Sequence, residues 1–180
     1  MKLKLFVLIL GLQTAWILGT TLVQEHGLST GKVVLLETQP VDPRDLLRGD
    51  YLTLNYKISD VPLNAFSPPL TNSPAPGTTV YVALEPRGAF YAVAKASTDP
   101  ISPENGSDVI LRGRAQAWWN NNSVHLEYGL ERYFIREGAG TRPSGRLTVQ
   151  VAVPASGRAQ IKHVLLDGKP FADAVKPSPQ

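Results

Sequence analysis

The pattern of hydrophobic and polar positions divides this chain into an uncharged N-terminal run and a longer body of short segments. Lys2 and Lys4 are followed by a stretch from Leu5 to Val23 that contains no charged residue. Its length is close to the ~20 residues that cross a bilayer as a helix, and a helix satisfies every backbone polar group internally. The run therefore predicts a membrane-spanning helix at the N-terminus.

This N-terminal run has the features of either a cleaved signal peptide or an uncleaved signal-anchor, since both have a basic start and an apolar stretch. No A-x-A pattern follows the apolar stretch, and Leu18-Gly19-Thr20 is a poor substitute for one. We therefore expect an anchor, with the basic start in the cytoplasm and residues from about 25 onward outside. The chain is predicted to be a single-pass protein of the cell inner membrane with a periplasmic or otherwise extracytoplasmic C-terminal domain.

After Gly31 the pattern changes to short runs typical of β-strands. These runs are rich in β-branched and aromatic residues, and clusters of Pro, Gly, Asn and Ser separate them. We expect strands over residues 32–38, 51–58, 79–85, 89–97, 109–119, 124–135, 146–154 and 159–168. The last two should form a hairpin across residues 154–158.

These elements predict an all-β protein, with a single sandwich- or barrel-like domain of about eight short strands after an N-terminal transmembrane helix. A length of 180 residues suits one domain with an appendage. The expected organisation is a signal-anchor helix at residues 1–25, a β domain at 26–172 and a disordered tail at 173–180.

Composition and charge narrow the classes of function. The chain is 43% hydrophobic and 18% charged, which suits a packed core. Without Lys2 and Lys4 it carries 16 basic against 15 acidic side chains, so we expect no nucleic-acid partner. The absence of cysteine excludes disulfides, thiolate metal sites and cysteine nucleophiles. The three histidines lack the spacing of metal ligands, so neither a metal nor a cofactor is expected.

The most unusual polar chemistry lies in the stretch PVDPRDLLRGDYLTLNY, residues 40–56. Its prolines, aspartates and glycine suit a capped turn that leads into a strand. In that strand the odd-numbered positions from Tyr51 to Lys57 face one side, and the even-numbered positions from Leu52 to Ile58 face the core. We thus expect Tyr51 to point outward, so packing in the core does not explain why a tyrosine stands at this position.

Several segments of this chain resemble one known family. Gly49-Asp50-Tyr51, Leu54 and Tyr56 spell GDYxxLxY, and this resembles the GDYXXLXY family of bacterial proteins. The segments LRGRA (111–115) and YGLERYFIREGAG (128–140) are also typical of that family, and the resemblance covers most of residues 31–168. It implies a short protein with one N-terminal membrane segment, whose gene lies near those of multi-pass membrane proteins. It supplies no established activity and no catalytic residues.

The candidate binding residues are Arg44, Arg48, Asp50 and Tyr51. Arg44 and Arg48 share a face if the turn between them is helical. Guanidinium groups held by carboxylates are a common means of gripping a carboxylate, a phosphate or a peptide end. Three interpretations stay open for this stretch: a purely structural turn, a surface for a ligand or partner, and a site of catalysis or cation binding.

No motif frames a catalytic residue, so we expect a binding role rather than an enzymatic one. The predicted function is a membrane-anchored extracytoplasmic interaction domain that acts with a multi-pass membrane protein. The alternative is an extracytoplasmic envelope hydrolase with a site around Arg48, Asp50 and Tyr51. A further hypothesis is that Glu131 or Glu137 pairs with the arginines of the 40–50 segment, Arg44 or Arg48, because the two segments carry complementary charge.

Overall fold

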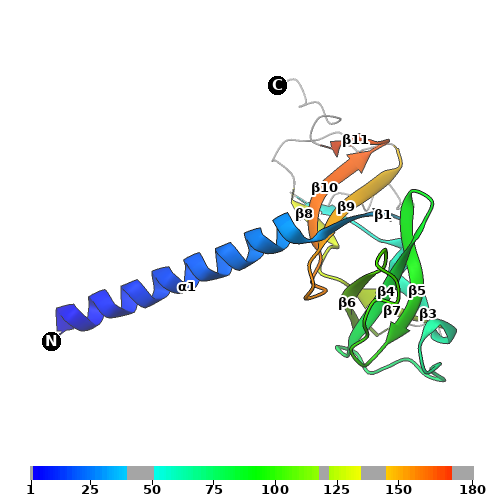
Figure 1. Ribbon diagram of the computed structural model, residues 1–180, viewed down its shortest axis with the longest axis horizontal. Coiled ribbons are helices and arrows are strands. Elements are labelled where there is room, and N and C mark those ends of the chain that lie inside the picture. Colours follow the sequence, from blue (N-terminus) through cyan, green and yellow to red (C-terminus); the bar gives the residue numbers. More distant parts are fainter. Residues whose placement is uncertain (1, 40–50, 118–121, 135–144, 172–180) are drawn as a thin grey trace.

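A computed structural model describes residues 2–39, 51–117, 122–134 and 145–171. One long helix, α1 (Lys2–Thr30), projects from a β domain that contains the rest of the described chain (Figure 1). The predicted all-β domain behind an N-terminal helix is therefore confirmed.

The helix α1 exposes apolar side chains along most of its length. Phe6, Trp16 and Val23 are 63%, 75% and 74% exposed, and none of the membrane-length part of α1 is buried against the domain. A helix that is hydrophobic all round requires apolar surroundings. By length and composition α1 can span a membrane, as the uncharged run predicts.

The junction between α1 and the domain requires a close approach of two backbones. The N–H of Gly31 donates to the carbonyl of Gly27 at 3.0 Å. A Cβ at Gly31 would lie 2.6 Å from that carbonyl oxygen and 3.1 Å from the nitrogen of Pro154. Only glycine fits this position without a shift of the backbone.

Eleven strands follow in the described residues, against the eight expected. They are β1 (Lys32–Glu37), β2 (Tyr51–Thr53), β3 (Asp60–Pro62), β4 (Thr79–Arg87), β5 (Phe90–Ser97), β6 (Val109–Ala115), β7 (Ser123–Glu127), β8 (Arg132–Phe134), β9 (Leu147–Val153), β10 (Gln160–Leu166) and β11 (Lys169–Pro170). Two short 3₁₀ helices, η1 (Lys57–Ser59) and η2 (Leu63–Ala65), flank β3.

The count differs because the predicted run 124–135 contains two strands and because β3 and β11 lie outside the predicted runs. The run 51–58 leaves regular pairing after Thr53 and ends in the 3₁₀ turn η1. The run 124–135 is divided into β7 and β8 at Gly129, which has φ = 79°. The alternation of the first run nevertheless holds, because Leu52, Leu54, Tyr56 and Ile58 are all buried.

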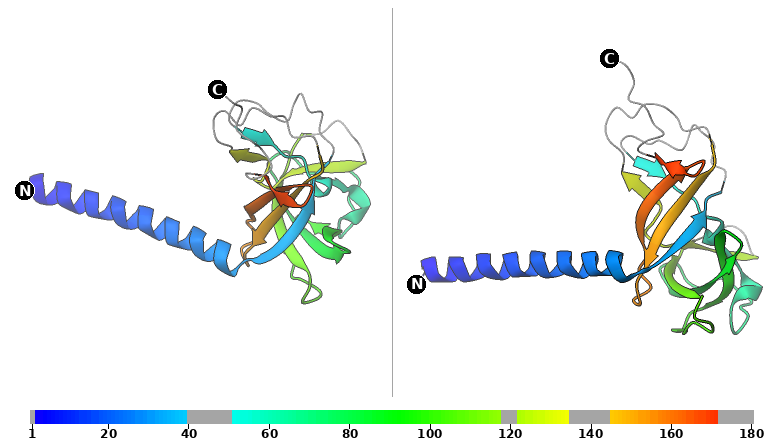
Figure 2. Two further views of the ribbon diagram at one scale, coloured as in Figure 1. Left: turned by 90° about the horizontal axis from the view of Figure 1, so that it is seen from above. Right: turned by 45° about the horizontal axis from the view of Figure 1, so that its top comes forward.

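The largest sheet is nearly closed into a barrel. Its antiparallel strands follow the order β3-β7-β6-β4-β5. A bridge between Phe66 and Ala96 joins the segment after β3 to β5, and the N–H of Ser67 donates to the Ala96 carbonyl at 2.8 Å. This bridge brings the two ends of the sheet together (Figure 2).

A second sheet, β1-β9-β10-β11, packs against the first and receives the chain from α1. The predicted hairpin across residues 154–158 is present as β9 and β10, with an irregularity between Ile161 and His163. Leu147, Val149, Val151 and Val153 of β9 are buried, as their alternation predicts. Thr148 and Ala152 on the opposite face are buried as well, so β9 is covered on both sides.

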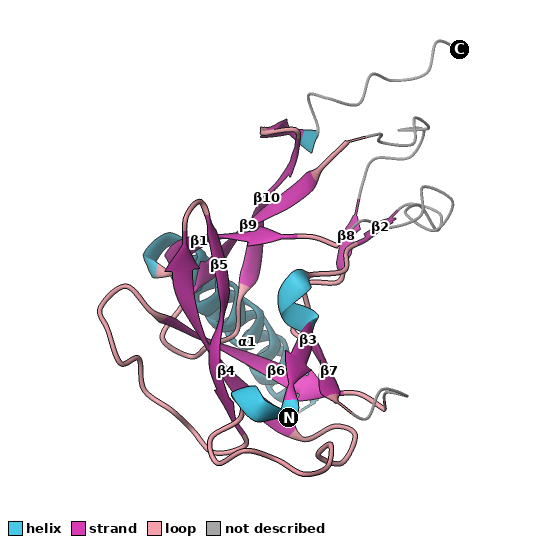
Figure 3. Ribbon diagram, turned by 90° about the vertical axis from the view of Figure 1, so that its right-hand side faces the viewer, coloured by secondary structure: helices cyan, strands magenta, loops and turns pink. Residues whose placement is uncertain are grey.

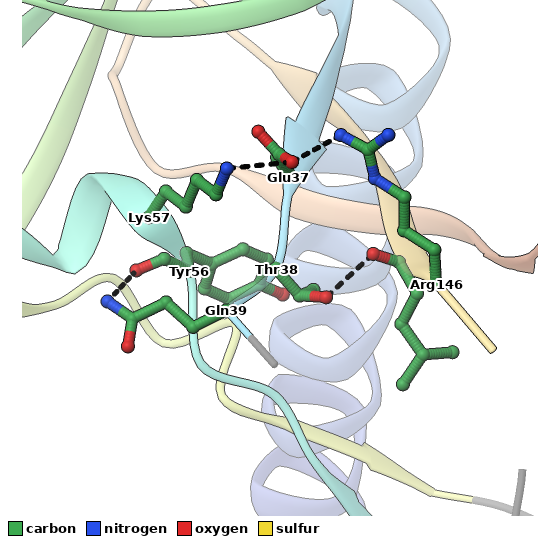
Figure 4. A network of polar contacts seen from close by, with 7 residues as sticks. Glu37, Thr38, Gln39, Tyr56, Lys57 and Arg146 are labelled. Atoms are coloured by element: carbon green, nitrogen blue, oxygen red, sulfur yellow. Dashed lines mark hydrogen bonds and ion pairs between the residues drawn. The ribbon is translucent and has the colours of Figure 1, made fainter. Parts of the chain in front are cut away.

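A polar junction ties the second sheet to the segment around Tyr56 (Figure 4). The Glu37 carboxylate of β1 binds Lys57 Nζ of η1 at 2.8 Å and also binds the guanidinium of Arg146. That guanidinium lies 4.9 Å from the centre of the Phe90 ring at the start of β5. The hydrogen bond from Lys57, assisted by Arg146, lowers the pKa of Glu37 below its ordinary value.

Replacement Glu37→Gln should lower the free energy of unfolding by about 1 kcal/mol or less at neutral pH, since its partners are half exposed. The folded-state pKa of Glu37 is depressed, so its stabilisation is present above the unfolded-state pKa and is lost as pH falls through the folded-state pKa. The difference between wild type and Glu37→Gln should therefore shrink below about pH 4.5 in urea unfolding followed by circular dichroism.

The matched control for this change is Glu85→Gln. Among the described residues Glu85 forms a salt bridge with Arg87 alone, two residues away on the same strand, and both side chains are more than a third exposed. Its replacement should change the unfolding free energy by less than about 0.5 kcal/mol. A Glu37→Gln effect that stays constant from pH 7 to pH 3 would contradict the ion-pair explanation.

Candidate functional site

The strands β2 and β8 form a separate two-stranded ribbon beside the barrel-like sheet (Figure 3). Tyr51, Leu52 and Thr53 pair in antiparallel register with Phe134, Tyr133 and Arg132. The N–H of Leu54 extends the pairing by donating to the carbonyl of Glu131 at 2.8 Å. The GDYxxLxY segment and the YGLERYF segment are therefore direct neighbours in space.

The outward side of this ribbon carries aromatic and basic side chains. We call it the β2–β8 face and define it by Tyr51, Arg132 and Phe134. The rings of Tyr51 and Phe134 meet edge to face with centroids 6.2 Å apart, and the Arg132 guanidinium lies 5.6 Å from the Tyr51 ring centre. Phe134 is 75% exposed, more than any other large hydrophobic residue in the described part of the β domain.

The β2–β8 face has a definite position relative to the helix. Both strands lie on the side of the domain from which α1 projects, whereas η2 lies on the far side (Figures 1 and 2). If α1 spans a membrane, the face lies on the membrane-proximal side of the domain.

Of the four candidate binding residues, the structure describes Tyr51. Arg44, Arg48 and Asp50 lie outside the described residues, as does Glu137, so the arginine site and its pairing with glutamates stay predictions. Glu131 is described, and its carboxylate accepts a hydrogen bond from the Tyr128 backbone N–H at 2.6 Å. Arg132 and Phe134 were not among the predicted site residues, because only the strand register brings them to Tyr51.

Two buried tyrosines lie on the inner side of the β2–β8 ribbon. Each donates a hydrogen bond to the chain segment that contains the other. Tyr56 Oη donates to the carbonyl of Leu130 at 2.8 Å. Tyr128 Oη donates to the carbonyl of Ile58 at 2.7 Å. We call this arrangement the tyrosine clasp. Burial raises the pKa of both phenols, so both hydroxyls stay protonated as donors at neutral pH.

The glycine of the LRGRA segment belongs to the same cluster. A Cβ at Gly113 would lie 3.1 Å from the ring of Tyr128 and 3.2 Å from the Cβ of Leu126. A glycine inside a strand often marks such a close approach. The segment 128–134 therefore contacts both other segments that carry the family resemblance, LRGRA through the Tyr128 ring and GDYxxLxY through Leu130 and Glu131, in a structural role.

A cross-strand pair of polar side chains lies nearby, between β3 and β7. His125 Nδ1 lies 2.7 Å from Asp60 Oδ1, and the Gln39 side-chain amide donates to Asp60 Oδ2 at 2.9 Å. Asp60 and His125 are register partners, so the contact reinforces the edge of the barrel-like sheet. Alternation within the 124–135 run indicates a rim position for His125 but not its partner on another strand.

Comparison with known proteins agrees with this structural picture. A family model described as GDYXXLXY protein matches residues 13–164. The chain therefore belongs to the GDYXXLXY family. No curated protein and no solved structure matches it.

The two tyrosines of the GDYxxLxY motif should respond differently to loss of the hydroxyl. Tyr56→Phe removes a buried hydrogen bond and leaves the Leu130 carbonyl without this donor, so the unfolding free energy should fall by about 1–3 kcal/mol. Tyr51→Phe keeps the ring contacts on the β2–β8 face and should cost less than about 0.5 kcal/mol. Urea unfolding of the full chain in maltoside micelles measures both values, and equal losses would contradict the clasp.

The close contact at Gly113 leads to a second prediction about stability. Gly113→Ala should destabilise the domain by about 1–3 kcal/mol, because the added methyl group meets a buried ring held by its own hydrogen bond. Gly106→Ala is the matched control, since a Cβ there meets nothing within 4 Å. Thermal unfolding of the two variants should show a loss only for Gly113→Ala, and a neutral result there would mean that Tyr128 can move.

Proposed function

We propose that this chain is a membrane-anchored extracytoplasmic domain that binds a multi-pass membrane protein through the β2–β8 face. The observation that supports the proposal most strongly is the exposed Phe134, which meets Tyr51 edge to face beside Arg132 on the side of the domain that bears α1. The helix α1 provides the anchor, and the two lysines in its first turn favour a cytoplasmic N-terminus.

The chemistry of this face suits a protein partner. Aromatic residues and arginine are the side chains most enriched where binding energy is concentrated in protein interfaces. Strand pairing fixes the backbone beneath Tyr51 and Phe134, so little conformational entropy is lost when a partner covers them. Arg132 adds a donor for a carboxylate or backbone carbonyl at the rim.

The anchor restricts the choice of partner. A domain held at the membrane by α1 meets other membrane proteins at high effective concentration. The resemblance to the GDYXXLXY family implies the same kind of partner, because it implies a gene that lies near those of multi-pass membrane proteins. Arg44, Arg48 and Asp50 are retained as candidates for the same surface, since Asp50 directly precedes Tyr51 in the chain.

The test is site-specific photocrosslinking of the full chain in its native membrane. Benzoylphenylalanine at position 134 should form a covalent product with a multi-pass membrane protein that mass spectrometry identifies. The same probe at Asn64, an exposed residue of η2 on the far side of the domain, should give no such product. Products with lipid alone, or with soluble proteins equally from both positions, would overturn the proposal.

The orientation of the chain needs its own measurement. A reporter enzyme that is active only outside the cytoplasm should be active when fused after Gln180. Activity of a cytoplasm-dependent reporter at the same point would place the domain inside the cell and reject the extracytoplasmic assignment.

A further inference from the structure

A cavity of about 460 Å³ lies at the base of α1, separate from the β2–β8 face. Its lining comes from the turn between β9 and β10, from strands β4 and β6, and from the loop that precedes β6. Much of the lining is apolar, and includes Pro100, Ile101, Pro103, Val109, Ile110 and Ala155. Such walls suit a ligand with an apolar body.

The charged side chains that line the cavity are mainly basic: Arg112 and Lys32 against Asp108. The Lys32 ammonium binds the backbone carbonyls of Gly106, at 3.0 Å, and Ser107. The Asp108 carboxylate accepts hydrogen bonds from the Asn105 backbone and side chain at 2.9 and 3.3 Å. Within the described residues no salt bridge joins Asp108 to either cation, so an excess positive charge faces the cavity.

Arg112 is held in place by packing, and no salt bridge joins it to an acidic side chain among the described residues. Its backbone N–H donates to the Gly157 carbonyl at 2.9 Å, and its guanidinium carbon lies 5.5 Å from the Tyr81 ring centre. Its Nε is buried and has no hydrogen-bond partner among the described residues. A buried donor without a partner is costly and rare in folded proteins, so it calls for a specific explanation.

We propose that this cavity binds the oxyanion of a phosphate or carboxylate ligand, with Arg112 as the principal anion-binding residue. A guanidinium offers several fixed donors that match the geometry of an oxyanion, and charge assistance strengthens these bonds. Lys32 supplies further positive potential, and the apolar walls cover the remainder of the ligand. This site is independent of the proposed partner-binding function.

The ligand can reach the cavity from either of two sources that share this chemistry. Pro154 lines the cavity and packs against Gly27 of α1. Gly27 lies four residues beyond Val23, or about 6 Å along a helix. If the uncharged run fills the hydrocarbon core, that distance falls within the headgroup layer, which is roughly 5–8 Å deep. The oxyanion could therefore belong to an anionic lipid or to a soluble molecule.

The experiment follows the arginine side-chain Nε–H signals of the ¹⁵N-labelled full chain by NMR in maltoside micelles. Loss of one signal in Arg112→Lys assigns Arg112, and an unchanged backbone amide spectrum shows that this variant is folded. Inorganic phosphate, added at constant ionic strength, should shift the Arg112 signal to saturation. Arg114→Lys, at the exposed position two residues along β6, should leave that response intact.

A second arm uses nanodiscs without added phosphate. A shift of the Arg112 signal in phosphatidylglycerol discs but not in phosphatidylcholine discs identifies the lipid headgroup as the source. A shift with free phosphate alone identifies a soluble ligand. By calorimetry Arg112→Gln should weaken binding of the phosphate probe at least tenfold, as expected for loss of a charged hydrogen bond. Absence of a saturable shift in both arms, or an unchanged affinity in Arg112→Gln, would overturn the proposal.

Discussion

The tyrosine clasp is the interaction on which the arrangement of the β domain most depends. Backbone carbonyls at Ile58 and Leu130 point into the core where two strand-like runs leave regular pairing, and each needs a donor there. Tyr56 donates to the Leu130 carbonyl, 74 residues away in the sequence. Tyr128 donates to the Ile58 carbonyl, 70 residues away. Because both tyrosine side chains are buried, solvent cannot readily take the place of their hydroxyl groups. The clasp therefore fixes where the two runs end and how they lie against each other.

This constraint also explains why one short motif serves two purposes. Alternation along residues 51–56 places Leu52, Leu54 and Tyr56 in the core and turns Tyr51 outward. The buried members hold β2 against β8, and that pairing positions Phe134 and Arg132 around the Tyr51 ring. A rigid interior thus presents an exposed aromatic face whose backbone is already ordered. The family motif is in this respect more structural than chemical, with Tyr51 as the described member that meets the exterior.

The junction with α1 defines the side of the β domain from which the helix leaves. Gly31 allows the helix end to approach the turn at Pro154, so the helix leaves the domain from one definite side. The β2–β8 face and the Arg112 cavity both lie toward that side, although they are built from different strands. Glu37 reinforces this region by joining β1 to η1 and to the entrance of β9. Features available for recognition are thus concentrated near α1, on the side that would face a membrane if this helix spans one.

Local sequence pattern determined the elements that depend only on side-chain direction. The uncharged run specified α1, and period-two alternation specified the strands, the buried face of residues 52–58 and the outward Tyr51, because successive side chains in a strand point to opposite faces. Only tertiary structure decided the division of the run 124–135 into two strands, the closure of the sheet at Phe66 and Ala96, and the contact of Tyr51 with Phe134. The same holds for the Nε of Arg112, which has no hydrogen-bond partner among the described residues. Each of these depends on register between segments distant in the chain, and local alternation carries no information about register between such segments.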